Sequence, residues 1–237
     1  MIRGGVEYDS LALDRRGLDA YLGEIADVDS AALRTRPERE QMAFWINAYN
    51  ALTLDLVLQN LNGPEGKGPR LKSIRDIPDA FSRPRRVVAG AQRSLDRIEN
   101  EMLRARFRDP RIHFALVCAA RSCPPLRPGA YTADSLDSEL TVAARAFLAD
   151  STRNSFRIRG GAIRLSKLFD WYGQDFVDAA PLISAPAVKA SRPAERALLT
   201  CLAPWLPPRA AAALAKARVR IEFLPYDWSL NDVPRRR

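Results

Sequence analysis

The chain has 237 residues, a length typical of one globular domain, with 47% hydrophobic and 27% charged residues. No apolar stretch reaches the roughly 20 residues that span a membrane, and three cysteines are too few for a disulfide framework. The formal net charge is +9, but the arginines that dominate it are scattered and no helix-turn-helix, RNA-binding or zinc-finger signature accompanies them. We therefore expect no nucleic-acid partner.

The start of the chain bears on its compartment. Residues 1–20 lack the apolar core of a signal peptide. We expect a soluble protein of the cytoplasm, or of the periplasm if a signal peptide has been removed. The preference for arginine over lysine, together with abundant alanine, is typical of GC-rich bacterial genomes and indicates a bacterial source.

Periodic apolar residues predict helices along most of the chain. In chain order these helices cover residues 10–27, 37–60, 95–107, 134–149, 166–178 and two segments within 193–217. Ser94 is the predicted N-cap of the helix over 95–107. The long helix over 37–60 ends at a strong breaker, Asn62-Gly63-Pro64, which opens a surface loop over 62–72.

Short apolar or alternating segments predict the strands. They lie at residues 86–90, 111–119, 156–165 and 219–223. Gly160-Gly161 divides the third segment into a hairpin with a two-residue turn, which argues for an antiparallel sheet. Helices outnumber strands, so the predicted fold class is α+β, a helix-rich single domain over 1–237 packed on a small, largely antiparallel sheet.

The segment from His113 to Pro125 carries the residues most capable of chemistry. His113 is the only histidine, and within the predicted strand it faces away from Cys118. Cys123 follows the strand in a loop that can fold back, so the feasible pair is His113 with Cys123. A cysteine becomes a nucleophile when a base or a positive charge stabilises its thiolate, and Arg121 lies nearby to supply charge.

Other interpretations of this segment stay open. The histidine and both cysteines are also compatible with a structural role in the core, which is the simpler interpretation. Cys118 and Cys123 are spaced for a disulfide, structural or redox-active, in an oxidising compartment. A zinc site is weaker, because zinc favours closer cysteine pairs and a fourth ligand. We therefore expect no metal and no other cofactor.

Further polar and aromatic residues are candidates for the same site. Glu99 and Asp227 are the carboxylates available to orient the imidazole, although each is also compatible with a surface ion pair or a polar cluster. Asparagine is a poor helix former, so Asn47 and Asn50 in one apolar helix indicate amides that bond to a loop or to a ligand. The predicted binding residues are Trp45, Asn47, Tyr49, Asn50, Arg121 and Trp228.

Five long segments together resemble a known family. They are AFWINAYNALT (43–53), SLDRIENEMLR (94–104), RIHFALVCAARSCPPLR (111–127), LSKLFDWYGQDF (165–176) and YDWSLND (226–232). In this order they are similar to the domain of unknown function 547, over about residues 6–232. The resemblance implies no particular reaction. Its signature positions fall on Trp45, Asn47, Tyr49, Asn50, Glu99, Arg104, His113, Cys118, Cys123, Pro124 and Asp227.

Two functions of different classes fit these observations. The first is a thiol-dependent hydrolase or transferase acting on a small acyl or peptide-like substrate, with Cys123 as nucleophile and His113 as base. The order of a long helix before a histidine segment is distantly similar to papain-like and transglutaminase-like enzymes. The second is a non-catalytic module that binds a small molecule or a protein.

Overall fold

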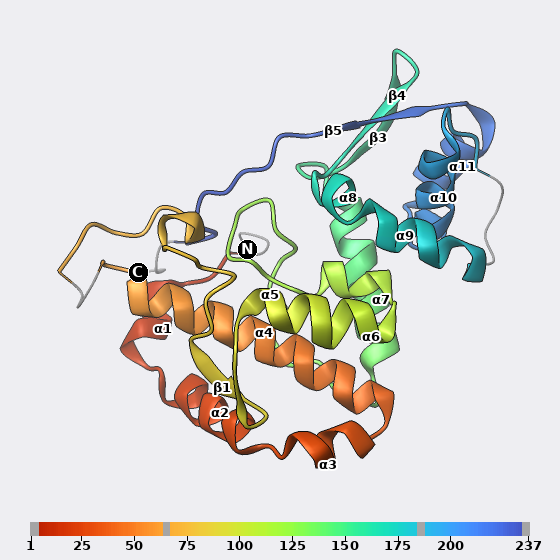
Figure 1. Cartoon of the computed structure of the whole chain (residues 1–237). Coiled ribbons are helices and arrows are strands. Elements are labelled where there is room, and N and C mark those ends of the chain that lie inside the picture. Colours follow the sequence, from red (N-terminus) through yellow and green to blue (C-terminus); the bar gives the residue numbers. More distant parts are fainter. Residues whose placement is uncertain (1–4, 64–66, 184–187, 234–237) are drawn as a thin grey trace. The chain divides into compact units, whose positions relative to one another are not determined.

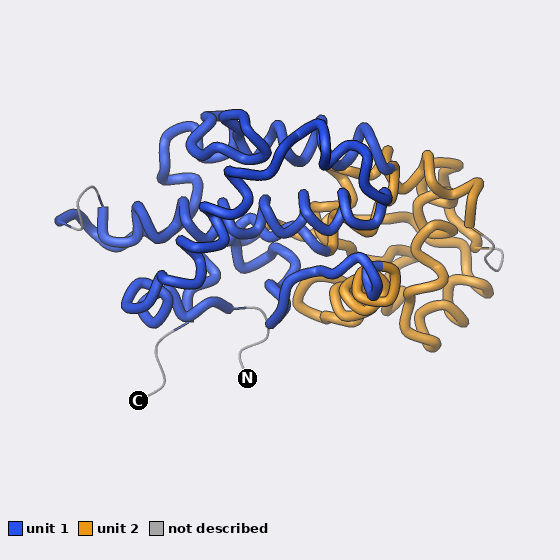
Figure 2. Tube along the Cα trace, turned by 90° about the horizontal axis from the view of Figure 1, so that it is seen from below, with its two compact units in different colours: residues 1–107, 115–136, 227–237 blue, residues 108–114, 137–226 orange. Residues whose placement is uncertain are grey.

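The chain forms two compact units in a computed structural model that describes residues 5–63, 67–183 and 188–233. Figure 2 shows the parts of the chain that make up each unit. Unit 1 comprises residues 1–107, 115–136 and 227–237, and unit 2 comprises residues 108–114 and 137–226. The tip of the predicted surface loop, residues 64–66, lies outside the described residues. The single domain over 1–237 stays a prediction.

Unit 1 is built mainly from helices. They are α1 (Tyr8–Leu13), α2 (Arg16–Asp27), α3 (Ser30–Thr35), α4 (Glu38–Asn60), α5 (Leu95–Arg97) and α6 (Ala105–Phe107). A π-helical segment, Ile98–Arg104, joins α5 to α6, and the three run on as one helix in Figure 1. Helix α4 packs against α1, α2, α5 and the π-helical segment. Its residues 48–53 are all buried, as expected of a helix covered on several faces.

Two of the predicted helices are confirmed in this unit, and a third is interrupted. Helix α4 matches the prediction over 37–60, and the Ser94 hydroxyl caps the helix that follows by accepting the Arg97 N–H at 3.1 Å. The segment predicted as one helix over 10–27 is instead α1 and α2. The Asp14 carboxylate accepts the Arg16 N–H at 3.2 Å, which starts a new helix in place of continuing the old one.

A short hairpin completes the regular structure of unit 1. Strands β1 (Arg86–Val88) and β2 (Ala91–Arg93) pair antiparallel. Ala89 and Gly90 connect them with φ of 50° and 72°, the left-handed values that a tight two-residue turn requires. The Ala89 N–H donates to the Ile25 carbonyl at 2.8 Å, which fixes the hairpin to the end of α2. The strand predicted over 86–90 is therefore confirmed up to Val88.

The strand predicted over 111–119 is wrong. Residues Pro110–Phe114 form a 3-10 helix, whose start is capped by the Asp109 carboxylate accepting the Arg111 N–H at 2.9 Å. Among the residues that the structure describes, no strand pairs with residues 115–117. Their backbone bonds instead to a side chain of α4, so the predicted placement of His113 and Cys118 on opposite strand faces does not hold.

Unit 2 combines helices with a three-stranded sheet. The helices are α7 (Leu136–Ala149), α8 (Leu168–Trp171), α9 (Gly173–Ala179), α10 (Pro193–Leu202) and α11 (Pro208–Lys216), and the strands are β3 (Ser155–Arg159), β4 (Ala162–Leu165) and β5 (Arg220–Phe223). The predicted hairpin is confirmed as β3 and β4. Gly160 and Gly161 adopt φ of 55° and 73° at its turn. Strand β5 adds to β4 in parallel.

An aromatic cluster forms the centre of unit 2. Phe114 packs against Phe147, Phe169 and Phe176, with ring centroids 5.4–6.0 Å apart. Phe114 is fully buried in this cluster, and it directly follows His113 in the chain. The core of unit 2 therefore fixes the backbone that carries the histidine.

The structure confirms the α+β class, because helices dominate and the strands form two small sheets. In the part of the chain that the structure describes, no helix combines the length and the apolar composition needed to cross a bilayer.

Candidate functional site

The two cysteines of the His113–Pro125 segment meet within unit 1. The backbone N–H of Cys118 donates to the Cys123 sulfur at 2.8 Å, and the two sulfurs are also 2.8 Å apart. Cys123 is buried and Cys118 is half-buried. We call residues 118–123 the sulfur loop. Its geometry gives the Cys123 sulfur two donors, one of them a backbone amide.

A left-handed residue folds the sulfur loop back on itself. Ala119, directly after Cys118, has a φ of 59° and is fully buried. This conformation costs an alanine roughly 1 kcal/mol, so the surrounding structure must hold it in place. The chain then turns again where the Cys123 N–H donates to the Ala120 carbonyl at 3.1 Å. The geometry of this turn is what returns Cys123 to Cys118.

The C-terminal segment of unit 1 holds the sulfur loop from outside. The Arg121 N–H donates to the Ser229 carbonyl at 2.9 Å, and the Ser122 N–H donates to the Asp227 carbonyl at 3.2 Å. The Ser122 hydroxyl accepts the Asp227 N–H at 2.9 Å. Residues more than 100 positions apart in the sequence therefore fix the loop that carries the thiols.

Asp227 serves this C-terminal segment as an internal acceptor. Its carboxylate accepts both the hydroxyl and the backbone N–H of Ser229, and these bonds, aided by the charge of Arg121, lower the pKa of Asp227. The neighbouring Trp228 lies under the guanidinium of Arg75 and edge-on to Phe81. The structure thus gives Asp227 a role in shaping the segment, while its predicted role toward an imidazole stays a prediction.

The third cysteine differs in environment from the other two. Cys201 lies in the core of unit 2 and is fully buried. Burial, with a smaller contribution from the charge of Asp109, raises the pKa of its thiol to about 12. Cys201 is therefore protonated at neutral pH and provides an internal reference for the reactivity of the sulfur loop.

His113 belongs to unit 2, where a carboxylate and an aromatic ring fix its imidazole. Its Nε2 lies 2.7 Å from Oδ2 of Asp175, in the first turn of α9. Its ring stacks on Tyr172 with centroids 4.2 Å apart, and its side chain is buried. A carboxylate bonded to one ring nitrogen sets the tautomer and the orientation of the imidazole, as in catalytic histidine–aspartate pairs.

Sequence reasoning did not select Asp175 as the partner of His113. The two residues are 62 positions apart, and no local pattern links them. The available signal was that Asp175 lies in the segment 165–176, which carries part of the family resemblance. Glu99, which the sequence offers as an orienting carboxylate, is buried in the π-helical segment of unit 1. Its role as an orienter stays a prediction.

The two asparagines of α4 bind backbone. The Asn50 amide donates to the Ala115 carbonyl at 3.0 Å and accepts the Val117 N–H at 2.9 Å. The Asn47 amide forms the same pair of bonds with Tyr131, at 2.8 Å each. These bonds supply the pairing that the irregular segments lack. A further role of the two amides in ligand binding stays a prediction.

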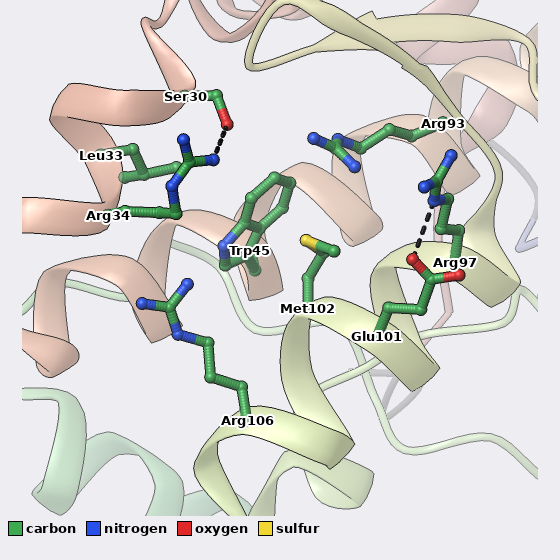
Figure 3. Close-up of a pocket in the computed structure, with 9 residues that line it drawn as sticks. All are labelled: Ser30, Leu33, Arg34, Trp45, Arg93, Arg97, Glu101, Met102 and Arg106. Atoms are coloured by element: carbon green, nitrogen blue, oxygen red, sulfur yellow. Dashed lines mark hydrogen bonds and ion pairs between the residues drawn. The ribbon is translucent and has the colours of Figure 1, made fainter.

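The remaining aromatic candidates on α4 lie at different places in unit 1. Tyr49 is buried, and its carbonyl accepts the Thr53 hydroxyl at 3.0 Å. Trp45 lines a cavity of about 290 Å³ that it shares with four arginines (Figure 3). The sequence displays those arginines as scattered charge, so it does not predict this cavity.

A metal site would need several ligand side chains grouped around one point. Within residues 5–63, 67–183 and 188–233, no three side chains of the histidine, cysteine, aspartate or glutamate types are grouped as a metal ion requires.

Comparison with known families places these features in context. Residues 33–148 match the family model described as "Protein of unknown function, DUF547". This part of the chain belongs to the DUF547 family. The DUF547 match includes α4, the sulfur loop and His113, whereas Asp175 and Asp227 lie beyond it. The chain matches no curated protein and no solved structure in the same comparisons. The distant similarity to papain-like enzymes stays a prediction.

Proposed function

We propose that this chain is a thiol-dependent hydrolase or transferase acting on a small acyl or peptide-like substrate, with Cys123 as nucleophile and His113 as base. One observation carries the proposal: the Cys123 sulfur lies 2.8 Å from both the amide nitrogen and the sulfur of Cys118. Two donors directed at one sulfur stabilise negative charge on it, and the thiolate is the nucleophilic form.

The histidine of unit 2 supports the same proposal independently. A buried imidazole that bonds to Asp175 through Nε2 has a fixed tautomer and a fixed orientation. This arrangement suits a group that accepts a proton from a thiol and returns it to a leaving group. Asp175 takes the orienting role in this proposal. The cooperation of His113 with Cys123 in one reaction is the part that needs a test.

The proposed reaction has two halves. The Cys123 thiolate attacks the acyl carbon, and the leaving group departs with the proton that the imidazole held. The covalent acyl–sulfur intermediate is then cleaved by water in a hydrolase, or by a second nucleophile in a transferase. The attacking molecule gives its proton back to the imidazole, and the thiol is regenerated.

Alkylation kinetics test the nucleophile and its base together. Wild-type chain is treated with iodoacetamide between pH 5 and 10, and labelling of each cysteine is followed by peptide mass spectrometry. We expect Cys123 to react with a pH midpoint below the ordinary cysteine value of about 8.5, while Cys201 stays unlabelled in the folded chain. Asp175→Asn should slow labelling of Cys123 at neutral pH by about tenfold or more, because the imidazole loses its orienting carboxylate.

The matched control is Asp178→Asn, which changes another carboxylate of the same helix α9. It should leave Cys123 labelling unchanged. Circular dichroism establishes that each variant is folded. Labelling of Cys123 as slow as that of Cys201 would eliminate the nucleophile, and equal rates in wild type and Asp175→Asn would eliminate the base.

The distance between the sulfurs also favours a second function, a reversible disulfide between Cys118 and Cys123. Closing this bond removes two protons and two electrons, which a disulfide compound such as oxidised glutathione accepts as it becomes two thiols. Thiol counting separates the two functions when the treated chain is unfolded in guanidinium chloride before the count, so that the buried Cys201 is included. This second function predicts that oxidised glutathione removes two of the three thiols and that dithiothreitol restores them. Three thiols throughout would exclude it.

A further inference from the structure

A cavity in unit 1 gathers positive charge from several elements. Figure 3 shows the guanidinium groups of Arg34, Arg93 and Arg106 around the indole of Trp45. The three arginines come from α3, the end of β2 and α6, and the tryptophan comes from α4. At about 290 Å³ the cavity is at the lower end of the range for small-molecule sites. It therefore fits a small metabolite better than a long chain.

Charge in this cavity is unbalanced. The cavity also contains Arg97 and Glu101, which pair with each other at 2.9 Å. No carboxylate of the described chain pairs with Arg34, Arg93 or Arg106. Arg34 instead donates to the Ser30 hydroxyl at 2.8 Å. Three cations without a paired carboxylate around one small space repel one another, and a bound anion would relieve that repulsion.

Arg93 is the buried member of the group. Its Nε donates to the Val88 carbonyl at 3.0 Å, and its guanidinium lies 5.1 Å from the centre of the Trp45 ring. Burial lowers the pKa of Arg93, the charge of Arg97 lowers it further, and only Glu101 acts in the opposite direction. A buried cation is ordinarily paired, so this one has the environment of a ligand-binding group.

The indole of Trp45 supplies an independent observation. Its side chain is almost wholly buried, and Nε1 has no hydrogen-bond partner among the residues that the structure describes. An indole nitrogen is a donor only. A buried donor without an acceptor costs about 1–3 kcal/mol, and such groups are rare in native proteins. The missing partner must therefore carry an acceptor atom.

We propose that this cavity binds the phosphate group of a small phosphorylated molecule. Arg34, Arg93 and Arg106 neutralise the phosphate, and the Trp45 N–H donates to one of its oxygens. A phosphate monoester carries a charge of roughly −1.5 to −2 and three terminal acceptor oxygens. Three separate guanidinium groups match that charge and those oxygens, whereas a single carboxylate is satisfied by one bidentate arginine.

Nitrogen-15 NMR on the full chain observes the missing hydrogen bond directly. The chain has four tryptophans, so tryptophan labelling gives four indole signals, and Trp45→Phe identifies the one from Trp45. Inorganic phosphate is the probe, titrated against sodium chloride at equal ionic strength. We expect phosphate alone to shift the Trp45 indole proton downfield with a saturable dependence, and the other three indole signals to stay in place.

Matched variants distinguish phosphate binding at this cavity from a general attraction of phosphate to positive charge. Arg106→Ala removes an exposed arginine of the cavity, and Arg39→Ala removes an exposed arginine of α4 that is not part of the cavity. We expect Arg106→Ala to weaken phosphate binding by about tenfold or more, the value of one charge-assisted bond, and Arg39→Ala to leave it unchanged. Both side chains reach solvent, so both variants should remain folded.

Three results would overturn this proposal. The Trp45 signal would respond to chloride as strongly as to phosphate, or Arg39→Ala would weaken binding as much as Arg106→Ala. Succinate, a dicarboxylate of the same charge, would bind as tightly as phosphate and so remove the preference for phosphate. None of these measurements involves the thiols, so this proposal and the proposed thiol function stand or fall separately.

Discussion

Helix α4 carries two kinds of buried or half-buried polar group within a few residues. The Asn47 and Asn50 amides each form a complete pair of bonds to backbone, whereas the Trp45 N–H has no partner in the described part of the chain. The amides are expensive to bury, and their bonds offset that cost. Burying the indole N–H of Trp45 also costs free energy, but no hydrogen bond within the described chain offsets that cost. The hydrogen-bonded amides explain how the fold is held together, and the unpartnered indole N–H marks where a ligand binds.

The hydrogen-bonded amide of Asn50 explains how a segment outside the helices and sheets is held in place. Residues 115–117 run between the histidine and the sulfur loop as irregular backbone. Asn50 gives this backbone the donor and the acceptor that a neighbouring strand would supply. The sulfur loop therefore depends on α4, although none of its atoms belongs to that helix.

The largest effect is expected at Asn50. Asn50→Ala leaves the Val117 N–H and the Ala115 carbonyl buried without partners, and it should lower the free energy of unfolding by about 3 kcal/mol. Urea denaturation followed by circular dichroism measures the change. Labelling of Cys123 should also lose its distinction from an ordinary thiol, because the backbone before the sulfur loop is released.

Asn47→Ala is the matched control for this change. It removes the same pair of bonds from the same helix, but Asn47 is only half-buried and water can replace its amide at Tyr131. The loss should be about half as large, roughly 1–2 kcal/mol. Equal losses for the two variants would show that burial does not set the strength of these bonds.

The sequence predicts those parts of the fold that local patterns determine. Apolar periodicity gives α4 nearly to the residue, and Gly160-Gly161 gives the turn between β3 and β4. The strand predicted over residues 111–119 is wrong for a physical reason. Its apolar composition is typical of a buried strand, but the bonds that satisfy residues 115–117 come from Asn50, 65 and 67 positions away. No local pattern contains that information.

The candidate sites also combine features that local sequence patterns predict with features that only tertiary contacts determine. The spacing of Cys118 and Cys123 allows their sulfurs to meet, but the left-handed turn at Ala119 that brings them together is not marked by a glycine. Asp175 reaches His113 through tertiary packing alone. The four cavity arginines are single residues of four different elements, and a sequence displays them as ordinary surface charge.

Trp45→Phe should have the smallest effect on stability. Phenylalanine removes the indole N–H and so relieves the cost of an unpartnered donor, about 1–3 kcal/mol. It also leaves a small void and a weaker ring beneath Arg93, which together cost a similar amount. The two changes oppose each other, so the free energy of unfolding should change by less than about 1 kcal/mol.

The same variant distinguishes the two kinds of polar group on α4. In wild type, phosphate should raise the urea midpoint, because it binds only the folded chain. In Trp45→Phe the same concentration should raise it less, since one donor is missing. A loss of stability as large as that of Asn50→Ala, with an undiminished response to phosphate, would mean that the indole is a structural group like the amides. The contrast between Trp45 and the two asparagines of α4 would then disappear, because all three side chains would serve the fold alone.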